Sequence, residues 1–167
     1  WRAELAADST PPVLSLPGSL SVEAEGPSGA AISFVATALD DTDGEVTVSC
    51  TASAGSIFPL GTTTVSCIAI DVAGNTVSGA FSVTVGDSAP PVLSLPAPIE
   101  VEASSAEGTS VAFAATAADA VDGEIGAACT PASGSRFPVG TTSVTCSAVD
   151  AHGNAATGSF PITVRPY

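Results

Sequence analysis

The sequence has very little positive charge and few aromatic side chains. Its 167 residues include no lysine, three arginines (Arg2, Arg136 and Arg165) and 17 acidic residues, which give a formal net charge of −14. A field of this sign repels nucleic acid and anionic membrane surfaces, and the scattered arginines form no basic patch. We therefore expect no nucleic-acid partner. Aromatic residues make up 5% of the chain, so rings that could stack on sugars are scarce.

Long apolar runs and a helical apolar period are also missing. No stretch approaches the roughly 18 apolar residues of a membrane span, and no charged-then-apolar leader opens the chain. We expect no membrane insertion, and we interpret the chain as a mature form or a piece of something longer. The 16 glycines, the 13 prolines and the many Val and Thr residues favour strands and turns. Helix should be close to absent.

The chain consists almost entirely of two copies of one module. Aligned at an offset of 79 residues without gaps, residues 8–85 match residues 87–164 at 40 of 78 positions. Each copy opens with Asp-Ser-x-Pro-Pro-Val-Leu-Ser-Leu-Pro, and such dense proline is typical of linkers and edge strands. We expect a leader or linker at residues 1–7, followed by modules at 8–86 and 87–167. Tandem units of about 80 residues usually serve spacing or repeated weak contact, not a single catalytic cleft.

Alternating polarity within each copy predicts half-buried strands. In the first copy we expect about seven, at residues 11–16, 20–25, 30–38, 45–51, 56–59, 62–71 and 76–85. This pattern indicates an all-β protein made of two tandem immunoglobulin- or fibronectin-like antiparallel β-sandwiches. Pro161 lies on the outward side of the last strand of the second copy. Because proline has no N–H to donate, its position predicts that this strand lies at a sheet edge.

Each copy contains two cysteines with 16 residues between them, Cys50 with Cys67 and Cys129 with Cys146. A zinc site needs four ligands, usually in close pairs, and the single histidine, His152, cannot complete one in both copies. We expect one internal disulfide per module, joining neighbouring strands. Disulfides persist in oxidising compartments, so we expect an extracellular or cell-surface protein.

A motif around the cysteines resembles a known family. It is Cys-x-x-x-x-Gly-Ser-x-Phe-Pro-[Leu/Val]-Gly-Thr-Thr-x-Val-x-Cys, preceded by Asp-x-x-Asp-Gly and followed by Ala-x-Asp-x-x-Gly-Asn, and it occurs in both copies. This run is similar to the hyalin repeat, or HYR domain, and the similarity covers about 156 residues. The family often has proline shortly after the first cysteine; the second copy keeps it as Pro131, and the first has Ala52. The resemblance implies a non-enzymatic, immunoglobulin-like extracellular module found in adhesion, matrix and surface proteins.

Repeated acidic residues form the one candidate site. In an immunoglobulin-like topology the loop after the third strand, the last hairpin and the start of the module lie at the same end of the sandwich. Calcium prefers six to eight oxygen ligands, so a calcium ion at the joint between modules is one hypothesis. The alternative is that these side chains only hold their own turns. The candidate ligands are Asp87, Asp119, Asp122, Asp150 and Asn154, with Asp8, Asp40, Asp43, Asp71 and Asn75 at the equivalent end of the first module.

Other residues give little support for chemistry. His152 replaces Ala73 of the first copy, so we interpret it as a solvated turn residue. No Gly-x-Ser-x-Gly elbow occurs, and the acids between Asp40 and Glu45 have no apolar pocket to raise a pKa. We expect no enzyme and no required cofactor.

The most probable function from sequence is therefore an extracellular structural or adhesion module that serves as a spacer, surface or matrix element. Its expected partners are neighbouring modules, other copies of the chain, or a surface or matrix protein. One alternative is a subunit of a self-assembling extracellular fibre or coat. Another is a protein- or carbohydrate-recognition module that uses its end loops.

Overall fold

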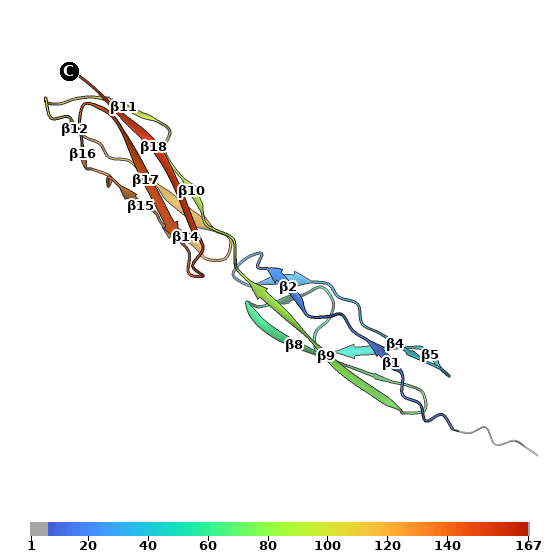
Figure 1. Cartoon of the computed structure of the whole chain (residues 1–167). Helices are drawn as coiled ribbons and strands as arrows, with labels where there is room; N and C mark the ends of the chain where they lie inside the picture. The colour runs from blue at the N-terminus through green and yellow to red at the C-terminus, as the bar shows by residue number, and fades with distance from the viewer. Residues whose placement is uncertain (1–6, 167) are drawn as a thin grey trace, which may run out of the picture. The chain divides into compact units, whose positions relative to one another are not determined.

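The computed structural model describes residues 7–166, so most of the expected leader or linker at residues 1–7 lies outside the described residues. The chain divides into two units, the first ending at Gly86 and the second beginning at Asp87. Every regular element in residues 7–166 is a strand, which confirms the all-β prediction (Figure 1). The first unit contains β1 (Val13–Ser15), β2 (Leu20–Glu23), β3 (Ala30–Ile32), β4 (Thr37–Asp40), β5 (Gly44–Val46), β6 (Val48–Cys50), β7 (Ser56–Phe58), β8 (Gly61–Ile70) and β9 (Thr76–Gly86). The second contains β10 (Val92–Ser94), β11 (Ile99–Glu102), β12 (Thr109–Ser110), β13 (Thr116–Asp119), β14 (Gly123–Gly126), β15 (Ala128–Thr130), β16 (Arg136–Phe137), β17 (Gly140–Val149) and β18 (Ala155–Arg165).

Each unit is built from one four-stranded sheet and two smaller sheets. In the first unit the larger sheet has the order β2-β9-β8-β6, and the smaller ones are β1-β4-β5 and β3-β7. The second unit repeats this arrangement with β11-β18-β17-β15, β10-β13-β14 and β12-β16. Neighbouring strands are antiparallel except for one pair per unit, because β2 runs parallel to β9 and β11 runs parallel to β18.

The expected strands at 30–38 and 45–51 are each divided in two. The first becomes β3, which pairs with β7, and β4, which pairs with β1 and β5. The chain thus changes sheets within one apolar run, a usual way of turning a corner in a sandwich. Phe34 lies in the break, and its ring still makes an edge contact with Phe81 at 4.9 Å between centroids. Because inward-facing residues continue across the break, the sequence pattern alone does not reveal it.

The core of each unit contains side chains from both layers. In the second unit Phe137 of β16 packs in one buried cluster with Val144 of β17 and Ile162 of β18. Their counterparts in the first unit, Phe58, Val65 and Val83, are also almost fully buried. Burial of these apolar side chains on both inner faces is what holds a small sandwich together.

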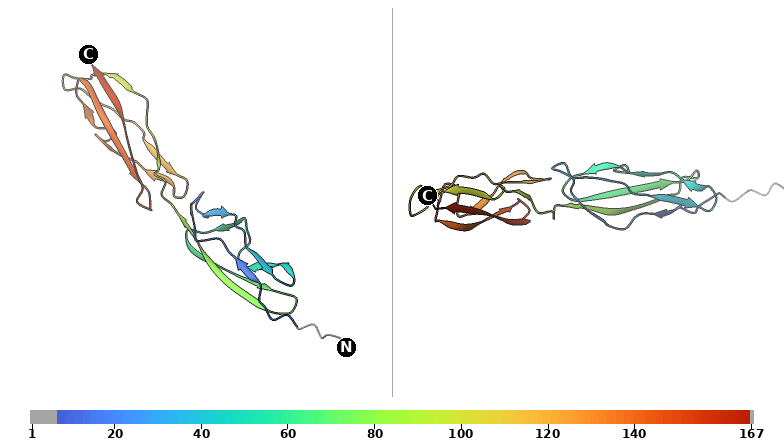
Figure 2. Two further views of the ribbon diagram at one scale, coloured as in Figure 1. Left: turned by 45° about the vertical axis from the view of Figure 1, so that its right-hand side comes forward. Right: turned by 90° about the horizontal axis from the view of Figure 1, so that it is seen from above.

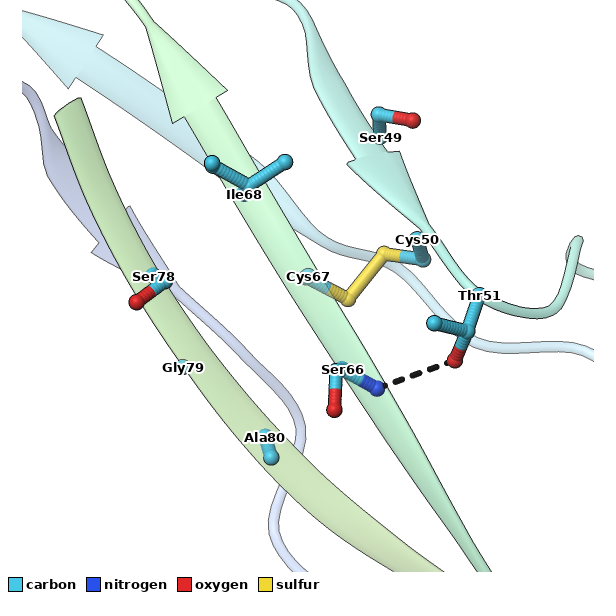
Figure 3. Close-up of a pocket in the computed structure, with 9 residues that line it drawn as sticks. All are labelled: Ser49, Cys50, Thr51, Ser66, Cys67, Ile68, Ser78, Gly79 and Ala80. Atoms are coloured by element: carbon cyan, nitrogen blue, oxygen red, sulfur yellow. Dashed lines mark hydrogen bonds between the residues drawn. A yellow bond between two sulfur atoms is a disulfide. The ribbon is translucent and has the colours of Figure 1, made fainter.

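Both predicted disulfides are present. Cys50 and Cys67 are direct cross-strand partners of β6 and β8, with 4.0 Å between their Cα atoms. Cys129 and Cys146 repeat this arrangement between β15 and β17. Figure 3 shows the first bridge tying the edge strand β6 to β8 within one sheet.

The prediction of an edge position for the last strand is wrong. β18 lies between β11 and β17, and β9 lies between β2 and β8. Pro161 is accommodated in another way: β11 pairs with β18 only from Ile162 onward, so at Pro161 the strand has β17 alone beside it. A proline in this position removes no ladder hydrogen bond to β11.

The chain enters and leaves each unit at opposite ends. Asp8 lies at the hairpin between β8 and β9, where its carbonyl oxygen accepts a hydrogen bond from the Asn75 side chain at 3.4 Å. From there β9 runs 11 residues to Gly86, a length of about 34 Å at the usual rise of a strand. Figure 2 shows β9 ending at the far end of its unit from the β4–β5 turn. In the second unit, Asp87 and β18 repeat this path.

Candidate functional site

Three segments of the first unit meet at the end where the chain enters. They are the segment around Asp8, the turn between β4 and β5, and the hairpin between β8 and β9. The backbone N–H of Val72 in the hairpin donates to Asp43 Oδ2 in the turn at 2.9 Å. The Asn75 side chain joins the hairpin to Asp8. The residues that the sequence placed at one end of the module are thus brought together.

Several of these acids hold their own loops. Asp40 Oδ1 accepts hydrogen bonds from the backbone N–H groups of Thr42 (2.9 Å) and Asp43 (3.0 Å). Asp71 accepts one from the backbone of Asn75 at 2.7 Å and a second from the Asn75 side chain at 2.8 Å. These contacts are typical of aspartate in turns, and the positive φ of Gly74 (94°) completes the hairpin. The turn-forming role that the sequence left open is therefore present.

The same carboxylates also converge on one point. One oxygen from each of Asp8, Asp40, Asp43 and Asp71 lies within 4.8 Å of the others. Asp40 is only 4% exposed, and its Oδ2, like Asp8 Oδ2, is buried without a hydrogen-bond partner. Residues 7–86 contain no lysine, arginine or histidine, so no side chain in this described part of the unit offsets the negative charge. The first unit therefore has a concentrated and uncompensated negative charge at this end.

In the second unit, a histidine joins the corresponding group. Asp87, Asp122, Asp150 and His152 each place one ligand atom within 4.8 Å of the others. His152 Nδ1 lies 3.0 Å from Asp87 Oδ2 and 3.3 Å from Asp122 Oδ2. Its contact with Asp87 is an ion-pair contact and not a well-aligned hydrogen bond, because Asp87 Oδ2 has no hydrogen-bond partner. The two arginines of this unit pair elsewhere, with Glu107 and Glu100.

The other predicted ligands have supporting positions. Asp119 lies outside the group, and its Oδ1 accepts hydrogen bonds from the backbone of Val121 (2.7 Å) and Asp122 (3.1 Å). The side-chain nitrogen of Asn154 donates to Asp150 Oδ2 at 2.8 Å and to the Asp87 carbonyl at 3.3 Å, as Asn75 does in the first unit. These contacts give Asp119 and both asparagines a clear role in shaping the loops.

The surroundings shift the pKa values of several of these groups. Burial by itself would raise the pKa of Asp71 and of Asp150, but hydrogen bonds from the asparagine and from nearby backbone N–H groups outweigh it, so each pKa lies below its usual value. Burial would lower the pKa of His152, but the hydrogen bond to Asp122 and the charges of Asp122, Asp87 and Asp150 raise it. Burial raises the pKa of Asp87.

Comparison with known proteins identifies the family of both units. The HYR domain matches residues 7–85 and again residues 86–164. The chain belongs to the HYR domain family. Hyalin of Strongylocentrotus purpuratus is 36% identical over 166 residues, which cover 94% of this chain and 14% of that protein. Hyalin of Lytechinus variegatus is 36% identical over 167 residues, covering 94% and 31%. The chain thus spans less than a third of either relative.

Solved structures with a related arrangement of strands come from other families. Human protocadherin-24 EC1-2 covers 90% of this chain and 98% of its own, at 17% identity and a TM-score of 0.41. The fibronectin(III)-like modules of CbhA from Clostridium thermocellum cover 92% and 95%, at 16% identity and a TM-score of 0.37.

The family and the disulfides together define the setting. The two HYR units are extracellular, adhesion-type modules, and the cystine in each is of the kind that persists outside the cell. Within residues 7–166, none of the structure forms a helix of the length and apolarity needed to cross a membrane.

The role of His152 was missed by sequence reasoning. It does lie in the turn between β17 and β18, but 37% exposure of its side chain and two carboxylate contacts make it part of the acidic group. One signal was available: the chain has a single histidine, and it replaces Ala73 between the paired Asp and Asn of the hairpin motif.

A second surface feature of the first HYR unit is a shallow open depression beside the disulfide (Figure 3). Thr51 Oγ1 at its rim accepts a hydrogen bond from the backbone N–H of Ser66 at 3.1 Å. The lining is made of small residues and one isoleucine: Ser49, Cys50, Thr51, Ser66, Cys67, Ile68, Ser78, Gly79 and Ala80. No aromatic ring lines it, so it offers no stacking platform of the kind that aromatic side chains provide.

Proposed function

We propose that this chain is a non-enzymatic spacer within a larger extracellular adhesion or matrix protein, and that each HYR unit adds its own length to the path of the chain. The observation that supports this most directly is the position of the two ends of each unit. The chain enters beside the β8–β9 hairpin at Asp8 and leaves at Gly86, at the other end of β9. A module with its termini at opposite ends extends a series, whereas adjacent termini would make it a side branch.

The construction of each unit suits this role. Both long strands of the hairpin are held along their length, since β9 is paired with β8 on one side and with β2 on the other. A disulfide ties the edge strand β6 to the same sheet. Unfolding such a unit must break ladder hydrogen bonds and expose its core together, which supports a fixed length under load.

The two alternative functions have weaker support. Assembly into a fibre or coat would need a self-associating surface, for which the exposed cross-strand pair Val13 and Leu39 in the first unit is the best candidate. In the second unit alanine replaces Leu39, so this surface is not repeated. Recognition by the end loops would use carboxylates, which favours cationic ligands over neutral sugars.

The spacer proposal is tested with chains of two, four and six HYR units, made by repeating residues 8–165 with their natural proline-rich seams. Small-angle X-ray scattering should give a maximum dimension that rises by a similar amount with each added pair, at concentrations where light scattering reports a monomer. A dimension that stays nearly constant would contradict the spacer role. Filaments in electron micrographs of the two-unit chain would favour the fibre or coat.

A further inference from the structure

We propose that the acidic end of the first HYR unit is a binding site for one calcium-like divalent cation, held by Asp8, Asp40, Asp43 and Asp71, and that His152 occupies the corresponding place in the second unit. This inference goes beyond the spacer role and concerns one unit by itself. It makes the two units chemically different although their folds are the same.

The first argument is the unpaired oxygen atoms. Asp40 is 4% exposed, its Oδ1 is occupied by the N–H groups of its own turn, and its Oδ2 is buried with no partner. Asp8 repeats this pattern, with Oδ1 accepting from Thr10 and a buried, unpartnered Oδ2. A buried carboxylate oxygen without a partner is costly, so such atoms call for a ligand.

The second argument is electrostatic. Four carboxylates gather within 4.8 Å, and residues 7–86 supply no cationic side chain to neutralise them. The hydrogen bonds from Asn75 hold the pKa of Asp71 below its usual value, which keeps that carboxylate charged. Like charges at this spacing repel one another, and a bound cation would reverse the sign of their contribution to stability.

The donor set indicates which cation fits. All four side chains offer oxygen, the ligand that hard cations such as calcium prefer. Calcium–oxygen distances of about 2.3–2.6 Å place ligands on opposite sides of the ion about 5 Å apart, which matches the observed spread. The site comes from three separate segments of the chain, so an ion bound there would fasten the start of the unit to its turn and its hairpin.

The second unit shows how the same fold manages without an ion. His152 Nδ1 lies between Asp87 and Asp122, at 3.0 and 3.3 Å. Its first-unit counterpart is the exposed Ala73. The imidazole ring fills space between the carboxylates and contributes nitrogen, a ligand that calcium accepts poorly. One substitution thus separates an open group of acids from a filled one.

Isothermal titration calorimetry on the full chain, stripped of metal and titrated with calcium chloride, tests the proposal. The expected stoichiometry is one ion per chain for the natural sequence. D40N should abolish binding, and A73H should do so while keeping all four carboxylates. A73Q, with a neutral side chain of similar size, is the matched control and should retain binding. H152A should raise the stoichiometry to two.

Thermal unfolding provides a second measurement that does not depend on heat of binding. Because calcium would bind the folded first unit only, its unfolding midpoint should rise by about 5 °C or more at tenfold excess over the dissociation constant. The A73H chain should show no such rise, although its histidine is tolerated in the second unit. No binding at millimolar calcium, binding unchanged by D40N and A73H, or two ions bound to the natural chain would each overturn the proposal.

Discussion

His152 Nδ1 lies 3.0 Å from Asp87 Oδ2, a contact with no counterpart in the first HYR unit, where Ala73 takes the place of the histidine. The ring faces three carboxylates, those of Asp87, Asp122 and Asp150, and their charges raise its pKa above 6.5. The second unit therefore carries an internal counter-charge whose strength depends on pH.

The first prediction concerns that dependence. A raised pKa in the folded state stabilises the second unit fully below about pH 6.5, and the contribution is lost as the pH rises through the folded-state value. The chain has one histidine, so its ring proton resonances can be followed singly by NMR, and their midpoint should lie above 6.5. H152A should lower the unfolding temperature of the second unit near pH 6 and have little effect near pH 9. An effect of equal size at both pH values would contradict the ion-pair role.

The second prediction concerns Asn154, whose side chain helps to hold the pKa of Asp150 below its usual value. A depressed folded-state pKa stabilises above the unfolded value, near 3.8, and this contribution is lost as the pH falls through the folded value. N154A should therefore destabilise the second unit at pH 6, and the difference should shrink below pH 3. Urea unfolding at several pH values measures this, and N75A should act in the same way on the first unit. A deficit that persists unchanged at low pH would show that the carboxylate is not involved.

The third prediction is the contribution of a single cystine. Replacing both Cys50 and Cys67 by alanine should lower the free energy of unfolding of the first unit by about 3 kcal/mol, as expected for closing a loop of this size. The second unit, with Cys129 and Cys146 intact, serves as an internal control and should unfold as before. Denaturant titration monitored by backbone NMR signals separates the two units. Equal destabilisation of both would mean that they unfold as one body.

The fourth prediction tests a glycine with no room for a side chain. A Cβ atom on Gly29 would lie 1.8 Å from the carbonyl oxygen of Phe58, and its φ of 102° also disfavours other residues. G29A should destabilise the first unit by more than about 3 kcal/mol or prevent its folding. G18A is the matched control, because nothing lies within 4 Å of the added atom, and it should change stability by less than about 0.5 kcal/mol. Circular dichroism during heating gives both values.

The sequence predicted the parts of the fold that depend on local pattern. The period-two alternation from Val65 to Ala69 identified β8 because one face of that strand is buried along its whole length. The cysteine spacing identified the disulfides for a similar reason, since 16 intervening residues suit a return to the neighbouring strand. Both signals depend only on residues close together in the chain.

The errors arose where a neighbour from elsewhere in the chain decides the structure. The strand expected at 30–38 changes sheets near Phe34, yet the ring still faces the core, so its polarity pattern is unbroken. Pro161 indicated an edge strand, but the ladder to β11 starts one residue later and leaves room for it. In the candidate site, the sequence brought the acids together but gave His152 no part, because the direction of its ring depends on Asp87 and Asp122 from two other segments.

The cross-strand position of the cystines has a mechanical consequence for a chain stretched from its ends. The Cα atoms of Cys50 and Cys67 are held 4.0 Å apart, whereas the 17 peptide steps between them would span about 60 Å if drawn straight. An oxidised unit that is pulled open therefore releases about 55 Å less slack than a reduced one, in each of the two units. Redox state thus sets how far the polypeptide lengthens before it becomes taut.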